Sequence, residues 1–459
     1  MVFSSVLFLF KFMPLAFLIY YILPEKFKNF SLIVLSLIFY SWGEVRYFPI
    51  MLFSIFLDYI CSNTIENHRD NKRLCKTMLW ISVFCNLGML GFFKYTDFFI
   101  RAVNTFFGLS IAELKLTLPL GISFYTFQTM SYTIDVYRNK VKAENNIVDF
   151  GAFVVLFPQL IAGPIVRFTD INKELKDRHL SLEDIDSGVR TFILGLASKV
   201  LIANNIGQLW TFTQEVGFEN ISTPMAWLAV IAFALQLYFD FSGYSLMAIG
   251  LGRALGFSFP QNFNYPFISR SMTEFWQRWH MTLGSWFREY VYFPLGGSRK
   301  GLKRTIFNLF IVWTATGFWH GAEWNYLFWG FYLFVVMILE KFFLKDILAR
   351  HRIFSHIYTL LMWHFSLIIF SVNHLGDMST LFNKTLIYTG GADWLYAVRN
   401  YGVVFLIAFI FSVPFVSNHF KVFEKKHKAA ATVIYIGLAA ASIAYLVDST
   451  YNPFLYFRF

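Results

Sequence analysis

Apolar segments of about 20 residues alternate with short polar segments along almost the whole chain. A helix needs roughly 20 mainly apolar residues to cross the hydrocarbon of a bilayer, so each such segment predicts one membrane-spanning helix. The pattern predicts about eleven to thirteen spans in all. They are expected near residues 1–23, 29–45, 47–65, 77–97, 116–137, 188–210, 225–250, 305–322, 324–343, 353–373, 400–419 and 429–447.

Two segments do not fit a simple span. Residues 147–166 are apolar, but Pro158 and the pair Gly163-Pro164 interrupt them, which favours a re-entrant or kinked element buried in protein. Residues 253–304 are rich in Trp, Phe, Tyr and Arg and are too polar to cross lipid as one helix. We expect short helices there, at the membrane interface, where aromatic and long basic side chains are stable.

Composition supports a membrane fold. Of the 459 residues, 57% are hydrophobic and 15% are charged, whereas soluble domains have about 45–50% apolar and about 25% charged residues. Disordered, collagen-like and disulfide-rich chains are excluded on the same grounds. No long polar stretch or internal repeat interrupts the pattern, so we interpret residues 1–459 as a single all-α, multi-span membrane domain.

The net charge of +11 reflects membrane topology rather than nucleic-acid binding, because the basic residues cluster in short loops between apolar segments. With the N-terminus outside, these loops fall on the cytoplasmic face, and the less basic loops 98–114 and 374–399 fall on the outer face. The first span is expected to be uncleaved. The basic loop residues are Arg69, Lys72, Arg73, Lys76, Arg138, Lys140, Lys142, Lys341, Lys345, Arg350, Arg352, Lys421, Lys425, Lys426 and Lys428.

Two of the ten histidines have unusual surroundings. His320 ends an apolar segment that contains no other ionisable group from Ile306 onward, and His280 ends a run of aromatic and polar residues. An ionisable side chain at such depth indicates a functional cavity, and burial keeps an imidazole neutral, which is the form that a general base needs. The alternative for His320 is helix packing, because Gly317 and Gly321 flank it at a spacing that is also typical of close helix contacts.

A polar patch lies inside the predicted span 225–250. It contains Tyr238, Asp240 and Ser242, which we expect to line the protein interior or a wet cavity. Asp240 is expected either to orient a histidine or bind a substrate hydroxyl, or else to cap a broken helix. Zinc-protease, nucleophile-elbow and Walker motifs are absent from the sequence, and the three cysteines match no metal spacing.

Several longer motifs carry a resemblance to one family. They are Phe275–Leu283 (FWQRWHMTL), Trp286–Gly301 (WFREYVYFPLGGSRKG), Phe318–Ala322 (FWHGA), Leu118–Gln128, Phe157–Ile165 and the terminal Phe454–Phe459. With these motifs, the chain resembles the membrane-bound O-acyltransferases, and within them the bacterial branch that acetylates alginate or peptidoglycan. The resemblance covers nearly the whole chain.

This resemblance implies that His320 is the catalytic base and His280 a second active-site histidine, both facing a central tunnel through the helices. It also implies an acyl thioester donor that enters from the cytoplasm and an acceptor hydroxyl that arrives from outside. Candidates for donor binding are Arg278, Trp279, Trp276 and Arg288, and candidates for the tunnel lining are Asp240, Tyr238, Ser242, Trp319 and Gln128. The arginines equally fit positive-inside topology, and the tryptophans equally fit interface anchoring.

The expected function is therefore transfer of an acetyl group from acetyl-CoA, a substrate rather than a bound cofactor, to an extracytoplasmic hydroxyl of a polysaccharide or peptidoglycan. The expected location is the bacterial cytoplasmic membrane. The resemblance further implies an exported partner of the SGNH-hydrolase type and catalysis without a metal.

Three alternatives stay open. Pro294–Arg299 has the acetyltransferase form, but Gly243-Tyr244-Ser245 is followed by Leu246, as in the D-alanyl transferases of teichoic acid, which use an acylated carrier protein. A lipid- or protein-acylating member of the family is another alternative. A membrane transporter, from a different class, is less favoured because the inverted repeats common in transporters are absent from the sequence.

Overall fold

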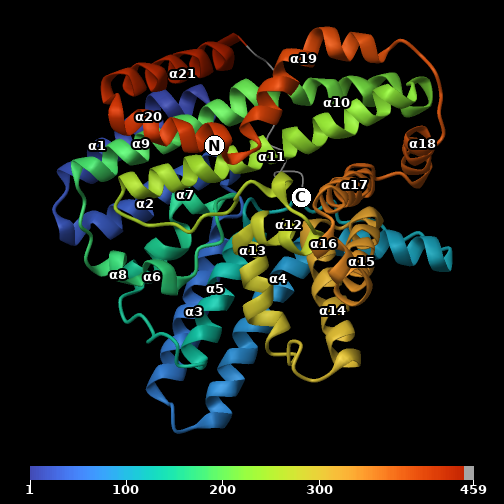
Figure 1. Ribbon diagram of the computed structural model, residues 1–459. Coiled ribbons are helices and arrows are strands. Elements are labelled where there is room, and N and C mark those ends of the chain that lie inside the picture. The colour runs from blue at the N-terminus through green and yellow to red at the C-terminus, as the bar shows by residue number, and fades with distance from the viewer. Residues whose placement is uncertain (449–459) are drawn as a thin grey trace. The chain divides into compact units, whose positions relative to one another are not determined.

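The computed structural model describes residues 1–448 (Figure 1). Every regular element in this range is a helix, so the all-α prediction is confirmed. The terminal motif Phe454–Phe459 lies outside the described residues. The described residues form two compact units, one made of Met1–Phe192 with Ser245–Pro260 and the other of Ile193–Tyr244 with residues 261–448.

The first unit contains the helices of the N-terminal part of the chain. They are α1 (Met13–Ile22), α2 (Glu25–Glu44), α3 (Phe48–Asn67), α4 (Lys72–Phe107), α5 (Ile122–Tyr137), α6 (Ile147–Val155), α7 (Phe157–Leu160) and α8 (Phe168–Lys176). The chain passes from one unit to the other within α9 (Leu182–Ala197), again within α11 (Thr223–Ala254), and a third time between Pro260 and Gln261.

The second unit contains the remaining helices. They are α10 (Asn204–Val216), α12 (Met272–Arg278), α13 (Met281–Phe287), α14 (Leu302–His320), α15 (Trp324–Leu339), α16 (Lys345–Arg350), α17 (Arg352–Ser371), α18 (Leu375–Leu386), α19 (Trp394–Phe411), α20 (Pro414–Lys426) and α21 (Lys428–Asp448). Short 3₁₀ and π-helical turns join several of these helices.

Eight helical segments of the described chain are long and apolar enough to cross a membrane. They are Phe48–Asn67, Lys72–Phe107, Leu182–Val216, Thr223–Ala254, Trp324–Arg350, Arg352–Ser371, Trp394–Phe411 and Lys428–Asp448, and each overlaps a predicted span. The predicted spans 29–45 and 305–322 are also helical, as α2 and α14, and 116–137 is helical only from Ile122, as α5. These three helices are shorter or more polar than the eight. The span predicted at 400–419 instead covers Trp394–Phe411, because Pro414 begins a new helix.

The two irregular segments have the local structure that the sequence predicts. In 147–166, α6 ends at Val155 and α7 begins at Phe157, with Pro158 in its first turn. A Cβ on Gly163 would lie 2.8 Å from the Cα of Gln159, so only glycine allows the chain to turn this tightly after α7. The segment 253–304 contains the short helices α12 and α13 and no long helix.

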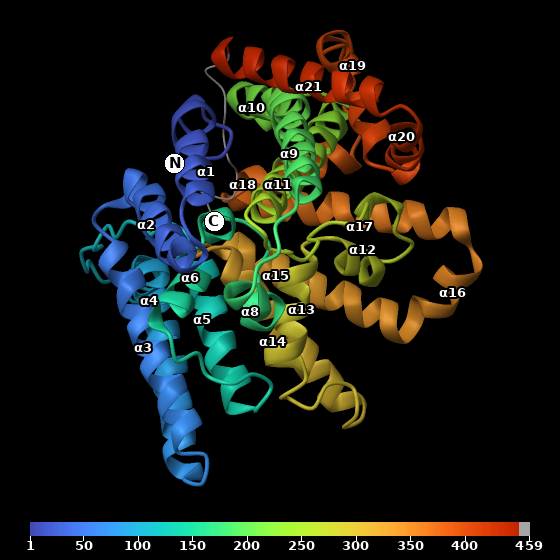
Figure 2. The same cartoon turned by 90° about the vertical axis from the view of Figure 1, so that its left-hand side faces the viewer.

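A buried carboxylate lies among α3, α4 and α5, which are side by side in the first unit (Figure 2). The Asp58 side chain is fully buried, and it accepts hydrogen bonds from Ser82, from Thr133 Oγ1 at 2.8 Å and from Asn86 Nδ2 at 2.7 Å. A buried polar group without such partners is costly, so these three donors allow an acid to exist inside an apolar helix bundle.

In the second unit, α14 and α15 approach so closely that their backbones touch. The Cα atom of Gly330 lies 3.4 Å from where a Cβ on Gly317 would be, and the carbonyl oxygen of Tyr326 lies 2.5 Å from the same point. Gly321 lies against the Tyr326 ring, at 2.1 Å from where its Cβ would be. Small residues thus make this crossing possible, and the crossing fixes the end of α14, where His320 lies.

We expect Gly317→Ala to destabilise the protein by roughly 1–3 kcal/mol, because the added methyl group meets a backbone carbonyl that cannot move without separating α14 from α15. Thermal unfolding of the detergent-solubilised protein measures this effect. Gly437→Ala on α21 is the matched control, because no atom lies within 4 Å of its new Cβ. Equal melting temperatures for the two variants would contradict the close crossing.

Candidate active site

His320 is the last residue of α14, and its side chain is buried, with 3% of the residue exposed. The imidazole meets aromatic rings edge to face on several sides. Ring centroids lie at 4.9 Å from Trp319, 5.0 Å from Trp329 and 5.5 Å from Phe370, with interplanar angles of 81° to 85°. Such contacts hold the imidazole in one orientation and exclude bulk water from around it.

His280 lies between α12 and α13, where its backbone has φ 45° and ψ 52°. A non-glycine residue in this left-handed region is uncommon and marks a constrained position. The His280 side chain is buried, and Nδ1 lies 3.1 Å from Oδ1 of Asn262. The same oxygen accepts from Thr282 Oγ1 at 2.9 Å.

These contacts set the protonation of His280. Burial lowers its pKa to about 3, so the imidazole is neutral throughout the physiological pH range. An amide oxygen only accepts hydrogen bonds, so Nδ1 carries the proton and Nε2 carries the lone pair. His280 therefore presents a hydrogen-bond acceptor at Nε2.

Trp319 brings the two histidines together. Its ring centroid lies 4.9 Å from that of His320 and 5.8 Å from that of His280, and all three residues belong to the second unit. In the sequence, α13, the turn Arg288–Tyr292, a loop and almost all of α14 separate the two histidines. In the structure, both imidazoles contact the same indole ring, that of Trp319.

The two tryptophans predicted for donor binding are packed beside this centre. Trp279 is buried against Phe263 at 5.1 Å and Trp363 at 4.9 Å between ring centroids. Trp276 contacts Trp329, one of the rings around His320, at 5.7 Å. These residues form an aromatic wall that continues from the histidines to α17, and such a wall is suited to an apolar acyl group.

The two predicted donor-binding arginines differ in their contacts. Arg278 is partly exposed, and its Nε donates to Glu274 at 2.9 Å while Nη1 donates to the carbonyl oxygen of Asn264 at 3.1 Å. Arg288 is exposed at the start of the π-helical turn Arg288–Tyr292. Arg288 therefore has the more accessible guanidinium of the two.

The predicted tunnel-lining residues of α11 lie in the same unit. Tyr238 contacts Trp279 at 6.1 Å between ring centroids, and Ser242 donates to the Tyr238 carbonyl oxygen. Asp240 forms a salt bridge with Lys199, at 2.6 Å between Oδ1 and Nζ, and both side chains are almost fully buried. Gln128 is fully buried on α5 in the first unit, and its amide has no hydrogen-bond partner within residues 1–448.

Sequence reasoning missed Lys199 and Asn262. Lys199 was detectable, because it is the one charged residue between Thr191 and Trp210 in the apolar stretch 188–210, and such charges have partners. Asn262 gave no local signal, since its role depends on a fold that brings it next to His280.

Glu340 is another residue that the sequence did not single out. It is buried beside α15 and accepts hydrogen bonds from the first backbone N–H groups of α12, those of Met272 and Thr273, and from Thr273 Oγ1 at 2.7 Å. A carboxylate at a helix N-terminus satisfies donors that the helix leaves unpaired. Glu340 thus anchors the helix that leads to His280.

We expect Glu340→Ala to lower both thermal stability and activity, because it leaves buried N–H groups of α12 without an acceptor at a cost of about 1–3 kcal/mol. Glu340→Gln keeps one acceptor oxygen and should retain most of both. Melting temperature and turnover of the two variants, measured side by side, check this. An Ala variant as active and stable as the Gln variant would show that the anchor is dispensable.

Within residues 1–448, no group of three or more His, Cys, Asp and Glu side chains is arranged to hold a metal ion. The structure brings together two imidazoles that contact one indole ring inside an aromatic enclosure. A neutral imidazole can accept a proton from a hydroxyl, and the aromatic wall can hold an acyl chain.

Comparison with known proteins defines the class to which this fold and site belong. Residues 141–376, which include both histidines, match the membrane-bound O-acyltransferase family. The chain belongs to this family, whose enzyme class is O-acyltransferase.

Particular relatives refine the comparison. The chain is 41% identical to the probable alginate O-acetylase of Pseudomonas aeruginosa, over 74% of this chain and 66% of that protein, so it spans about two thirds of that relative's length. It is 36% identical to the peptidoglycan O-acetyltransferase of Helicobacter pylori, over 78% and 71% of the two chains. It is 31% identical to the teichoic acid D-alanyltransferase of Streptococcus thermophilus, over 49% and 57%.

Proposed function

We propose that this chain transfers an acetyl group from acetyl-CoA to a hydroxyl group of a polysaccharide or peptidoglycan. The observation that carries the proposal is that two buried histidines, His280 and His320, both contact the Trp319 ring. Both lie inside the region that matches the family. The two acetylating relatives are more similar to this chain, and over more of it, than the D-alanylating relative, which favours acetyl as the transferred group.

In this proposal, His320 is the general base. Its imidazole takes the proton of the acceptor hydroxyl while the oxygen attacks the thioester carbonyl carbon. The C–O bond forms and the C–S bond breaks, and the coenzyme A thiolate leaves with the proton returned from the imidazolium. Trp276 and Trp279 form the apolar wall for the acyl group, and the exposed Arg288 is placed to attract a phosphate of the donor.

The membrane setting extends the proposal. Eight apolar helical segments make the chain a multi-pass membrane protein, and the basic loops favour an orientation with the N-terminus outside the bacterial cytoplasmic membrane. The donor then enters from the cytoplasm. On the outer side of the membrane, the acetyl group needs a molecule with a hydroxyl group to receive it. An exported protein of the SGNH-hydrolase type is the proposed partner for this step.

The test is to incubate the purified protein in detergent with radiolabelled acetyl-CoA and, separately, with a D-alanyl-loaded carrier protein. Release of free coenzyme A is expected with the first donor only, and label is expected on the acceptor polymer when the proposed partner is also present. Turnover with the carrier protein alone would replace acetyl by D-alanyl as the group moved. Binding of neither donor, measured directly by calorimetry, would overturn the proposal.

A further inference from the structure

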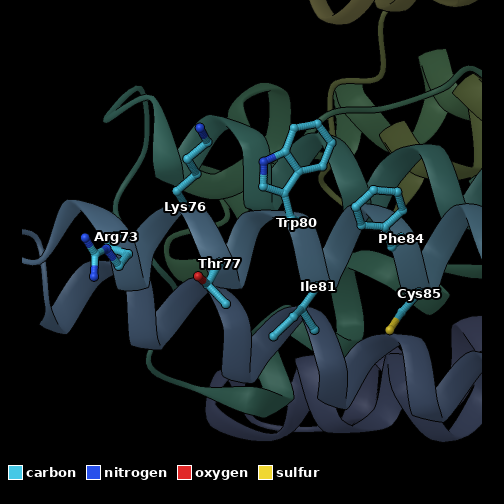
Figure 3. Close-up of a pocket in the computed structure, with 7 residues that line it drawn as sticks. All are labelled: Arg73, Lys76, Thr77, Trp80, Ile81, Phe84 and Cys85. Atoms are coloured by element: carbon cyan, nitrogen blue, oxygen red, sulfur yellow. The ribbon is translucent and has the colours of Figure 1, made fainter.

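One face of α4 carries a continuous stripe of side chains that lines a shallow groove of about 440 Å³. Figure 3 shows these residues in order along the helix. They are Arg73, Lys76, Thr77, Trp80, Ile81, Phe84 and Cys85. Their spacing of three and four residues places all of them on one side of the helix.

The stripe is basic at one end and apolar along the rest. Arg73 and Lys76 lie within the first two turns of α4 and are exposed, and neither forms a salt bridge with any residue in the described part of the chain. Beyond them, Trp80 and Phe84 stack at 5.3 Å between ring centroids and are 46% and 68% exposed. Two cations without a salt-bridge partner in the described residues, Arg73 and Lys76, therefore lie next to an exposed aromatic surface.

The length of the stripe matches one half of a bilayer. From Arg73 to Cys85 the helix rises by about 18 Å, at 1.5 Å per residue. The hydrocarbon of one leaflet is roughly 15 Å thick. A molecule with its charge at Arg73 and Lys76 would thus have its apolar part beside Trp80, Ile81 and Phe84 over the depth of one leaflet.

We propose that this groove is a binding site for an anionic phospholipid. The phosphate group lies between Arg73 and Lys76, and one acyl chain lies along Thr77, Ile81 and Phe84. A free phosphate or a nucleotide would leave the aromatic part of the groove empty, and a neutral lipid would leave the two cations without a counter-charge. An anionic phospholipid is complementary to both parts.

A second groove, in the other unit, has a similar composition. It is lined by Ile347, Arg350, His351, Arg352, Ile353 and Phe354 and has a volume of about 640 Å³. Because it also combines basic and exposed apolar residues, it serves as an internal comparison. Loss of the α4 site should remove about one lipid rather than all of them.

The experiment is native mass spectrometry of the full chain in detergent with phosphatidylglycerol, compared with phosphatidylcholine of the same chain length. The wild-type protein is expected to retain phosphatidylglycerol preferentially. Arg73→Gln/Lys76→Gln should weaken that binding on the order of tenfold or more, since each surface cation contributes appreciably to binding an anionic lipid. Inorganic phosphate, which has the charge but no chains, should not displace the lipid.

Lys72→Gln/Lys142→Gln is the matched control, because it removes two exposed cations that do not line the groove. Phe84→Ala should weaken binding of long-chain but not of short-chain phosphatidylglycerol. An equal loss in the control, equal binding of the neutral lipid or displacement by inorganic phosphate would each overturn the proposal. The readout is lipid binding, so it is independent of the acetyl-transfer assay.

Discussion

Replacing His320 by alanine is expected to reduce acetyl transfer by roughly 10²- to 10⁴-fold, the usual contribution of a general base. The imidazole is enclosed by Trp319, Trp329 and Phe370, so no other side chain or bulk water easily takes over proton removal. Coenzyme A release and label on the acceptor measure the effect. The melting temperature should fall no more than in a variant that removes another buried histidine, because the imidazole packs against Trp329 of α15 and Phe370 of α17 but carries no charge pair.

His364→Ala is the matched control for this variant. His364 is also a buried histidine of the second unit, 6% exposed, and its ring stacks on Trp227 at 4.1 Å between centroids. Its removal costs similar packing but touches neither His320 nor His280. Transfer should stay within a few-fold of wild type. Full activity in His320→Ala, or an equal loss in His364→Ala, would refute the assignment of the base.

Breaking the Lys199–Asp240 pair is expected to give the largest loss of stability. Removing one partner of a buried ion pair leaves an uncompensated charge, which costs about 3–5 kcal/mol. Lys199→Met and Asp240→Asn should therefore each lower the melting temperature strongly. Thermal unfolding in detergent, with both single variants prepared identically, measures the loss.

The double variant Lys199→Met/Asp240→Leu separates a structural role from a chemical one. Replacing a buried pair by apolar residues of similar size is often neutral or stabilising, so the double variant should be more stable than either single variant. Recovery of stability with recovery of transfer would show that Asp240 only balances Lys199. Recovery of stability without transfer would show that Asp240 also acts on the substrate.

Local chemistry explains why parts of the fold were predictable. Pro158 and Gly163 break the apolar segment 147–166 by backbone geometry alone, so the break needed no knowledge of the neighbours. Asn71 caps α4 by accepting a hydrogen bond from the Leu74 N–H, but the apolar pattern placed the start of this span at residue 77. The apolar pattern indicates which residues lie in the hydrocarbon of the membrane, whereas the capping residue indicates where the helix begins.

The sequence could single out candidate residues for the site but not the contacts among them. His320 and His280 could be selected because buried ionisable groups are costly and therefore rare. Their common contact with Trp319 depends on how the segment from Gln261 to His280 folds back, which Asn262 and Glu340 stabilise through long-range hydrogen bonds. No pattern of nearest neighbours encodes such contacts, because each links positions many residues apart.

The left-handed backbone at His280 sets which amino acids evolution and mutagenesis can place there. Asparagine and glycine adopt φ 45° readily, whereas a β-branched residue does not. Position 280 therefore has two requirements, a residue that tolerates left-handed backbone angles and a side chain that is an imidazole. Asparagine meets only the first requirement, and valine meets neither. Comparing these two substitutions separates what the imidazole does from what the turn does.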